Sequence, residues 1–412
     1  MKAYDQPQQA TAVEDRDAGW LDRKVLAVLS ASLNGNCGEI TLTLPSGFTT
    51  QLGIGEPKAD VRLKSYMPLL RLYLGGINGW SESYLAGEWE SSDLTSLVKW
   101  ALSCEEALTR LSKASFVTGL LHNLYHSRRD NSRSGSKKNI AAHYDLGNSF
   151  YNHWLDESMT YSAALYSHPD EPLKHAQDNK YDRILELLEA NAGEEVVEIG
   201  CGWGGFALRA GRDHQLNVHG ITLSQEQLKW AQEKIAKANI DTDVRLTLTD
   251  YRDLNKQYDA VVSIEMFEAV GEQHWDTYFE TLKRVLKPGG KAVLQIITIE
   301  DERFHSYRKQ ADFIQRYVFP GGMLPSNSVL RSKIEQHGFK LQRQQLFGKD
   351  YARTLRTWFR DFEHSWERIR QQGFDDTFYR LWRYYLAYCE GGFEHGALDV
   401  GLYVISHAED GR

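Results

Sequence analysis

The fold is decided at residues 196–205, which have the sequence VVEIGCGWGG. A short apolar run of β-prone residues passes into a turn with four glycines, and residues 207–210 then begin a helix. Strand, glycine turn and helix make the first βα unit of a doubly wound sheet. Glycine is needed in such a turn because the backbone bends tightly and approaches a ligand closely. The stretch therefore predicts an α/β fold with a ligand site at the turn.

Glu198 lies just before the glycine turn and is well placed to accept hydrogen bonds from hydroxyls or an amine. A fixed negative charge at this point argues against a pyrophosphate ligand. A cationic nucleoside such as S-adenosylmethionine (SAM) is a better match. The alternative is a turn that serves packing alone, because glycine-rich turns are common.

Length and charge limit the partners that this chain could have. It has 412 residues, enough for one large domain and a smaller one. The net charge is −8, from 48 basic and 56 acidic side chains, which predicts no global attraction to nucleic acid or to an anionic membrane. The amino terminus lacks the apolar segment of a signal peptide, and no apolar run reaches the roughly 20 residues that span a bilayer. Any membrane contact must therefore be local.

The four cysteines are scattered, at positions 37, 104, 201 and 389. No pair has the spacing of a metal site or a redox motif, and no metal is expected. Unpaired cysteines are typical of a reducing compartment. A reducing cytoplasm is the simplest assumption.

Changes in composition divide the chain into four segments. Residues 1–18 are polar and are expected to be a disordered tail, whereas residues 19–125 are expected to form a small α+β accessory domain. Residues 126–138 are basic, rich in serine and almost without apolar residues, which is typical of a mobile linker. A contact with anionic lipid head groups is the alternative for this segment. Residues 139–412 contain the glycine turn and are expected to be the catalytic domain.

Further strands and helices are expected around the glycine turn. Apolar patterns predict a helix over 176–189, strands over 218–223, 244–248, 258–264 and 292–298, and a second helix capped by Ser224. Polar residues follow several of these strands, at the edge where open α/β sheets bind ligands. Beyond Ile299 the chain is expected to be helical, with an amphipathic segment over 301–316 and two aromatic stripes within 355–386. Such stripes are usually core, but an acyl-chain tunnel would show the same pattern.

Several short motifs follow one another in a defined order. They are HYDLGN (143–148), YS (161–162), EIGCGWGG (198–205), TLS (222–224) with Gln227, DYRDL (250–254), MFE (266–268), FPGG (319–322), and FG (347–348) with DY (350–351). In this order they resemble the cyclopropane fatty acid synthase family, SAM-dependent enzymes that modify double bonds in phospholipid acyl chains. The resemblance covers roughly residues 139–405. It implies a Rossmann-like SAM methyltransferase domain with helical lipid-binding insertions, preceded by a small lipid-engaging α+β domain.

The resemblance assigns the SAM site by position. The residues that would line it are Tyr161, Ser162, Gly200, Gly202, Thr222, Leu223 and Gln227, with Glu198 added on the physical argument above. The acid that usually binds the ribose at the end of the second strand is replaced by Thr222 and Gln227, as in this family. Asp250 would accept a hydrogen bond from the adenine amino group, with Tyr251 and Arg252 packed nearby.

The resemblance also assigns the base that removes a proton to a bicarbonate ion, held by a Cys, a Glu, a His and a Tyr. Glu268 and Tyr351 match this pattern. The Cys position is Ala163 and the His position is Gln295, which puts bicarbonate in doubt. This chain also has Glu265 where the family usually has a small residue.

Glu265 adds a carboxylate near the expected reaction centre, where it could stabilise a carbocation and take a proton directly. Two nearby carboxylates also push one pKa upward, which suits a base. The catalytic set is therefore predicted to be Glu268, Tyr351, Glu265 and Gln295. The alternatives are an ion pair between Glu265 and an arginine, a Gln295 that only satisfies a buried polar group, and a bicarbonate ion that still binds through Glu268 and Tyr351.

The sequence thus predicts transfer of a methyl or methylene group from SAM to the cis double bond of an unsaturated acyl chain in a membrane phospholipid. The product would be a cyclopropane or a methyl- or methylene-branched chain. Two alternatives are a methyltransferase for a soluble small molecule and a non-catalytic SAM- or lipid-binding protein. We expect a cytoplasmic protein in peripheral contact with the inner membrane surface. A homodimer through the amino-terminal domain is compatible with the sequence, but no residue demands it.

Overall fold

The structure is a computed structural model that describes residues 19–33, 37–111, 135 and 146–408. The chain divides into two compact units, one up to residue 115 and one from residue 116 onward. The predicted tail at 1–18 and the predicted linker at 126–138, apart from Gly135, lie outside the described residues. Within the described ranges, no helix is long and apolar enough to cross a bilayer.

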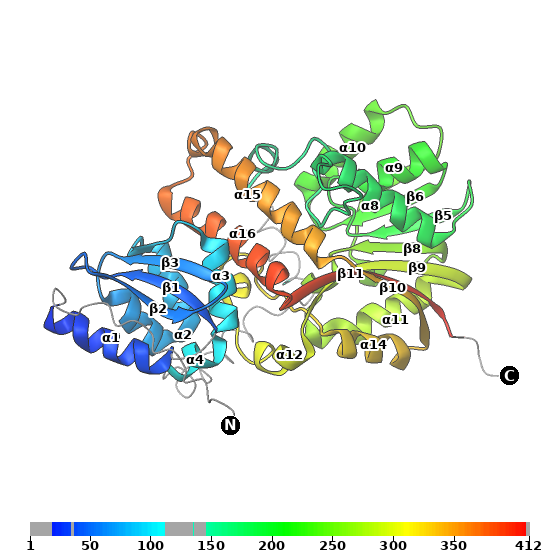
Figure 1. Cartoon of the computed structure of the whole chain (residues 1–412). Helices are drawn as coiled ribbons and strands as arrows, with labels where there is room; N and C mark the ends of the chain where they lie inside the picture. The colour runs from blue at the N-terminus through cyan, green and yellow to red at the C-terminus, as the bar shows by residue number, and fades with distance from the viewer. Residues whose placement is uncertain (1–18, 34–36, 112–134, 136–145, 409–412) are drawn as a thin grey trace, which may run out of the picture. The chain divides into compact units, whose positions relative to one another are not determined.

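The first unit contains a four-stranded sheet with the order β2–β1–β3–β4 (Figure 1). The strands are β1 (Gly38–Thr43), β2 (Thr49–Ile54), β3 (Lys58–Leu63) and β4 (Trp89–Glu90), and only the β1–β3 pair is parallel. The helices are α1 (Trp20–Ser32), α2 (Met67–Leu85), α3 (Leu94–Ser103) and α4 (Glu105–Leu111). The buried side chains of Leu42, Val61 and Trp89 form part of its core. This unit is a small α+β structure, as the sequence predicts.

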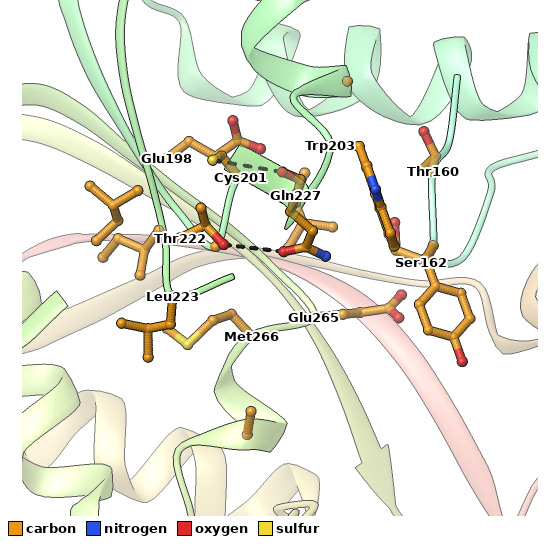
Figure 2. Close-up of a pocket in the computed structure, with 18 of the residues that line it drawn as sticks. Thr160, Ser162, Glu198, Cys201, Trp203, Thr222, Leu223, Gln227, Glu265 and Met266 are labelled. Carbon is orange, nitrogen blue, oxygen red and sulfur yellow. Dashed lines mark hydrogen bonds between the residues drawn. The ribbon is translucent and has the colours of Figure 1, made fainter. Parts of the chain in front are cut away.

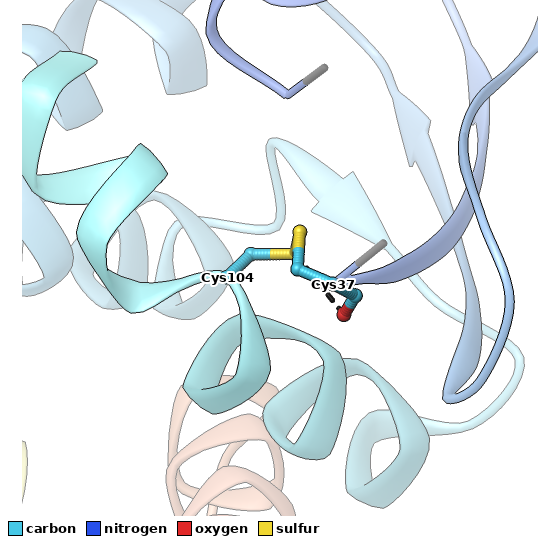
Figure 3. The surroundings of a disulfide bond; sticks show 2 residues. All are labelled: Cys37 and Cys104. Carbon is cyan, nitrogen blue, oxygen red and sulfur yellow. Dashed lines mark hydrogen bonds between the residues drawn. A yellow bond between two sulfur atoms is a disulfide. The ribbon is translucent and has the colours of Figure 1, made fainter. Parts of the chain in front are cut away.

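Two of the four cysteines are paired, which their scattered spacing in the sequence did not indicate. Cys37 lies just before β1, Cys104 lies at the end of α3, and the two form a disulfide (Figure 3). They are 67 positions apart in the chain, and they meet because α3 packs against β1 and β3. Cys201 and Cys389 are unpaired. The pairing removes the cysteine argument for a reducing compartment.

The second unit is built on a seven-stranded sheet with the order β10–β11–β9–β8–β5–β6–β7 (Figure 1). Five strands run parallel, namely β5 (Glu195–Ile199), β6 (Asn217–Thr222), β7 (Val244–Leu248), β8 (Tyr258–Ile264) and β9 (Leu286–Ile299). β11 (Leu398–His407) is antiparallel to β9 and to the edge strand β10 (Phe339–Leu346). This order confirms the doubly wound sheet and places the glycine turn within it, at the end of β5, which lies between β6 and β8.

Helices cover both faces of this sheet. Figure 1 shows α8 (Leu173–Leu188), α9 (Gly205–His214) and α10 (Gln225–Lys237) on one face, and α11 (Trp275–Val285) and α14 (Asn327–Gln336) on the other. The second face carries a large apolar cluster in which Trp275 and Phe279 of α11 pack against strand residues such as Val261 and Leu294. Burial on both faces is the reason why the central strands have apolar residues at consecutive positions, such as Val196–Val197 in β5 and Val261–Val262 in β8.

The region after Ile299 is not wholly helical, which corrects one prediction. It contributes the two strands β10 and β11. The expected helix over 301–316 is instead two short helices, α12 (Asp301–Tyr307) and α13 (Phe313–Tyr317). The break occurs because the side chain of Asp312 accepts a hydrogen bond from the Gln315 backbone N–H and so caps a new helix.

The two aromatic stripes lie on the long helices α15 (Gly348–Arg370) and α16 (Asp376–His395), which pack side by side (Figure 1). Trp358, Phe362 and Trp382 are fully buried, so these positions form core. The short elements of this unit are α7 (Asn148–Tyr151), η1 (Tyr251–Asp253), η2 (Phe267–Ala269) and η3 (Glu272–His274).

Candidate active site

A pocket of about 150 Å³ opens beside the glycine turn, at the carboxyl ends of β5, β6 and β8 (Figure 2). Its wall includes most of the residues predicted for SAM binding, and it also includes one of the predicted catalytic residues. These are Tyr161, Ser162, Glu198, Gly200, Gly202, Thr222, Leu223, Gln227 and Tyr251, together with Glu265. The structure therefore brings together residues that lie up to about a hundred positions apart in the sequence.

The glycine turn approaches the loop after β8 closely. Gly200 has φ 88°, in the left-handed region, and a Cβ atom there would lie 2.9 Å from Cγ of Met266. Its backbone N–H donates to the carbonyl of Ile221, which ties the turn to β6. The glycine is thus required both for the backbone conformation and for the close contact.

Glu198 is 3 % exposed and presents a carboxylate to the pocket (Figure 2). Its Oε2 atom has no hydrogen-bond partner among the described residues. Burial raises the pKa of Glu198 to about 8. A cationic ligand would favour the ionised carboxylate, so the site suits an ammonium or sulfonium group rather than an anion.

The loop after β6 presents an amide to the same pocket. The Thr222 hydroxyl donates to Oε1 of Gln227 at 3.1 Å (Figure 2), which leaves the amide NH₂ of Gln227 as a donor. Ser224 caps α10, as predicted, because its hydroxyl accepts a hydrogen bond from the Gln227 backbone N–H. The cap and the Thr222 contact together fix the direction of the Gln227 side chain.

Two of the residues predicted for adenine recognition do not line this pocket. The Asp250 carboxylate accepts hydrogen bonds from the Arg252 guanidinium at 2.8 and 2.6 Å and caps η1. Tyr251, between them, does line the pocket wall. The contact between Asp250 and an adenine amino group stays a prediction.

Glu265 follows β8 directly and is held by three donors. Oε1 accepts from the backbone N–H of Ala163 at 2.8 Å and from Nε2 of Gln295 at 2.7 Å, and Oε2 accepts from the Tyr351 hydroxyl at 2.8 Å. Within the described ranges no arginine is paired with Glu265, so the ion-pair alternative does not apply. Burial raises the pKa of Glu265, while these donors and the charge of Lys180 lower it.

The backbone at Glu265 has φ 47°, a conformation that residues with a Cβ rarely adopt. The Glu265 N–H donates to the carbonyl of Gln295 at 2.9 Å, which extends the β8–β9 ladder by one bond. The backbone of Glu265 is therefore fixed by the sheet, and its carboxylate is fixed by three hydrogen bonds. Strain of this kind concentrates at functional sites.

Glu268, Gln295 and Tyr351 are not part of the pocket wall, although Gln295 and Tyr351 contact Glu265. Oε1 of Glu268 accepts from the backbone N–H of Ile297 at 2.6 Å, and its Oε2 has no partner among the described residues. Burial, with the Glu265 charge, raises the pKa of Glu268 to about 8. Gln295 is fully buried, and its amide donates to Glu265 and, at 3.4 Å, to the carbonyl of Ala163. Three of the four predicted catalytic residues, Glu265, Gln295 and Tyr351, thus form one connected set.

Lys180 was not predicted, although it belongs to this site. It is on α8, is fully buried and donates from Nζ to the Ser162 hydroxyl at 2.6 Å. The signal in the sequence was its place between Ala176 and Ile184, on the apolar face of the predicted helix. A charge at such a position is uncommon unless it has a partner.

The donor set expected for bicarbonate is engaged by the protein itself. The Tyr351 hydroxyl, which the resemblance assigns to that ion, donates to Glu265. Ala163 supplies only a methyl group in place of the family thiol, and its backbone N–H also donates to Glu265. These residues therefore do not fit a bicarbonate ion held by Tyr351.

Comparison with known proteins gives consistent matches. Residues 131–402 match the family model described as mycolic acid cyclopropane synthetase. The chain is 36 % identical to the tuberculostearic acid methyltransferase UfaA1 of Mycobacterium tuberculosis over 91 % of this chain and 90 % of that protein. It is 35 % identical to the cyclopropane-fatty-acyl-phospholipid synthase of Escherichia coli K12, over 85 % and 88 %. The mycolic acid cyclopropane synthase CmaA1, solved with SAH and CTAB, matches with a TM-score of 0.63 and 29 % identity, over 65 % of this chain and 97 % of that one.

Proposed function

Because this chain belongs to the mycolic acid cyclopropane synthetase family, and is a SAM-dependent methyltransferase with the Rossmann-like fold of that family, we propose that it methylates cis double bonds in the acyl chains of membrane phospholipids. SAM supplies an electrophilic methyl group when bound. Glu198, Gln227 and the glycine turn are proposed to hold it at the pocket described above. The relatives named for fatty acyl chains support an acyl substrate.

We propose that Glu265 is the base of the reaction and takes the place of bicarbonate. The observation that carries this proposal is the set of three donors on its carboxylate, contributed by Ala163, Gln295 and Tyr351. Such donors fix both oxygens in the pocket wall, where a carboxylate stabilises positive charge on the chain. Its raised pKa makes it a stronger base than an exposed glutamate.

The proposed chemistry balances without a further reactant. The π electrons of the alkene form a bond to the methyl carbon of SAM as the carbon–sulfur bond breaks, and this leaves a carbocation on the acyl chain. A hydride shift along the chain moves the cation, and Glu265 then accepts a proton from a neighbouring carbon. The electron pair of that C–H bond forms the new alkene, so the product is methyl- or methylene-branched and still unsaturated. Loss of the proton from the added methyl with ring closure would give a cyclopropane instead.

Mass spectrometry of acyl chains tests this proposal. Vesicles with a cis-monounsaturated phospholipid are incubated with the enzyme and with SAM that carries a labelled methyl group. We expect a gain of one labelled carbon with the alkene retained. A labelled ring with no alkene would refute the branched product, and labelling only of soluble acceptors would favour a small-molecule methyltransferase. No turnover despite tight SAM binding would indicate a non-catalytic binding protein.

The variant Glu265→Gln tests the assignment of the base. A glutamine keeps the volume but cannot accept the proton, so turnover should fall by about 100-fold or more. Glu302→Gln, at an exposed carboxylate on α12, is the matched control and should be as active as the parent. Wild-type turnover by Glu265→Gln that depends on added bicarbonate would instead assign the base to the dissolved ion.

We propose peripheral contact with the inner membrane surface and a cytoplasmic location. The support is the basic sequence of residues 126–138 and the lipid substrate class of the relatives. Neutral substitutions in residues 126–138 should reduce co-sedimentation with anionic vesicles. The five basic residues to be replaced are Arg128, Arg129, Arg133, Lys137 and Lys138. Equal co-sedimentation of the variant and the parent would remove this stretch from the proposal. The accessory role of residues 19–125 in lipid contact, and its pairing into a homodimer, stay predictions.

A further inference from the structure

Lys180 is a cation enclosed by the catalytic unit. Among the described residues it is the only lysine or arginine with its side chain wholly withdrawn from solvent. It projects from α8 to the back of the pocket wall and lies 4.4 Å from the centre of the Tyr181 ring. Burying an ammonium group is costly unless charge or hydrogen bonds compensate for the lost water. The groups that contact Lys180 should therefore indicate which function its charge has in the site.

The direct acceptor of Lys180 is a residue of the pocket wall. Nζ donates to Oγ of Ser162 at 2.6 Å, and Gln177, one turn earlier on α8, donates to the Ser162 carbonyl at 2.9 Å. An ammonium has no acceptor, so Ser162 can only receive this hydrogen bond. The hydroxyl proton of Ser162 is then free to donate on the pocket side. Lys180 thus sets Ser162 as a donor towards the ligand.

The same segment links Lys180 to Glu265. Ser162 is followed by Ala163, whose backbone N–H donates to Oε1 of Glu265 at 2.8 Å. α8 therefore acts on Glu265 in two ways. Its contacts with Ser162 position the neighbouring Ala163 N–H, which donates to Glu265, and the charge of Lys180 stabilises the ionised Glu265 carboxylate. Glu265, Asp156, Glu198 and Asp178 favour the charged form of Lys180, whereas burial lowers its pKa to about 7.

Several groups face Glu265 from other elements. The donors are Ala163 from the loop before α8, Gln295 from β9 and Tyr351 from α15, and the charged groups are Lys180 from α8 and Glu268 from η2. Lys180 is the only cation in this set. Without it, three carboxylates, those of the buried Glu198 and of the partly buried Glu265 and Glu268, would share the site with no positive charge from the described residues.

We infer that Lys180 is a positioning residue, which directs the Ser162 hydroxyl towards the SAM held in the pocket and balances the negative charge of Glu265 from α8. The second half of this inference rests on the proposed function of Glu265 as the base. The first half does not, because it concerns the cofactor alone. The two halves predict different changes in different measurements.

The first measurement is SAH affinity by calorimetry at neutral pH. Lys180→Met removes the charge at similar length, and Ser162→Ala removes the hydroxyl. Each should raise Kd about 10-fold, since each removes a hydrogen bond to a charged group. The double variant should bind no more weakly than either single variant, because both changes break one chain of contacts. Lys229→Met, at an exposed lysine of α10, should bind like the parent.

The second measurement is the pH profile of kcat on unsaturated phospholipid vesicles. Loss of the Lys180 charge raises the pKa of Glu265, so the acid limb should move to higher pH in Lys180→Met. Ser162→Ala keeps that charge and should keep the acid limb of the parent. A merely structural role would lower kcat at all pH values without moving the limb.

The outcomes separate the two proposals. Unchanged SAH affinity together with an unchanged acid limb in Lys180→Met would overturn the inference. Full activity of Glu265→Gln would refute only the assignment of Glu265 as the base. The SAH affinities of Lys180→Met, Ser162→Ala and the double variant would still decide whether Lys180 acts through Ser162. Thermal denaturation with SAH shows whether Lys180→Met is folded. If it is not, Lys180→Gln, which retains a polar end group, should show the same two changes.

Discussion

The Tyr351 hydroxyl donates to Oε2 of Glu265 at 2.8 Å, although 86 positions separate the two residues in the chain. Tyr351 lies in the first turn of α15, and Glu265 follows the central strand β8. Burial raises the pKa of the Tyr351 phenol well above its usual range, so the phenol keeps its proton and acts as a donor. The contact fixes one carboxylate oxygen and lowers the pKa of Glu265 relative to burial alone.

Tyr351→Phe should therefore change the pH dependence as well as the rate. Loss of the donor raises the pKa of Glu265, so the acid limb of kcat moves to higher pH. At neutral pH we expect kcat to fall about 10-fold, the size expected for a hydrogen bond to a charged group. Steady-state kinetics from pH 6 to 9 would check this. A lower kcat with an unmoved limb would mean that Tyr351 acts only through packing.

Glu268→Gln should make stability less dependent on pH. The folded-state pKa of Glu268 is about 8, above its ordinary 4.5, so the folded protein holds this proton more tightly than the unfolded chain does. The resulting stabilisation is complete below pH 4.5 and is lost as the pH rises to about 8. Urea unfolding at pH 5 and pH 8.5 should show a smaller loss of stability with pH in the variant than in the parent. Equal losses would place the charge of Glu268 in contact with water.

Gly200→Ala should weaken cofactor binding, and Gly289→Ala provides a matched control. The two glycines have similar φ, 88° and 82°, but a Cβ at Gly289 would meet no atom within 4 Å. Both variants should lose about 1–2 kcal/mol of stability because an L side chain disfavours this conformation. Only Gly200→Ala should also lose SAH affinity, since its Cβ presses on Met266 at 2.9 Å. Equal SAH affinity in both variants would show that the close approach is unimportant.

The disulfide of the first unit should stabilise that unit under oxidising conditions. A loop closed over 67 positions is expected to contribute about 4 kcal/mol on chain-entropy grounds. Thermal unfolding with and without reductant should show a lower Tm in reductant, and Cys37→Ser should unfold at the same Tm in both. Thiol counting in denaturant should find two free thiols, those of Cys201 and Cys389. Four free thiols would show that the bond does not form.

Short sequence patterns predicted correctly those helices and strands whose formation depends on residues close by in the sequence. The strand at 244–248 matches β7, and Ser224 caps α10, because apolar alternation and a capping serine act within a few positions. β10 was missed because its interior, Lys340–Gln345, is polar except for Leu341, and it becomes a strand only by pairing with β11. Its place at the sheet edge allows those polar side chains to face water.

The contacts of the site were harder to predict than its members. The sequence motifs named Glu265, Gln295 and Tyr351, but their mutual hydrogen bonds arise only when β8, β9 and α15 come together. Lys180 had no motif, and its role depends on the direction of one hydroxyl, that of Ser162. The pairing of Cys37 with Cys104 likewise depends on how α3 lies on its sheet.

The carboxylate of Glu265 is joined to the protein by covalent bonds. A dissolved anion must be captured from the surroundings before each cycle, and its occupancy then follows the amount of carbon dioxide that the cell takes up or releases. A side chain has a fixed effective concentration in every folded molecule. The rate of lipid methylation by such an enzyme would thus be the same in cells with a high and in cells with a low concentration of carbon dioxide.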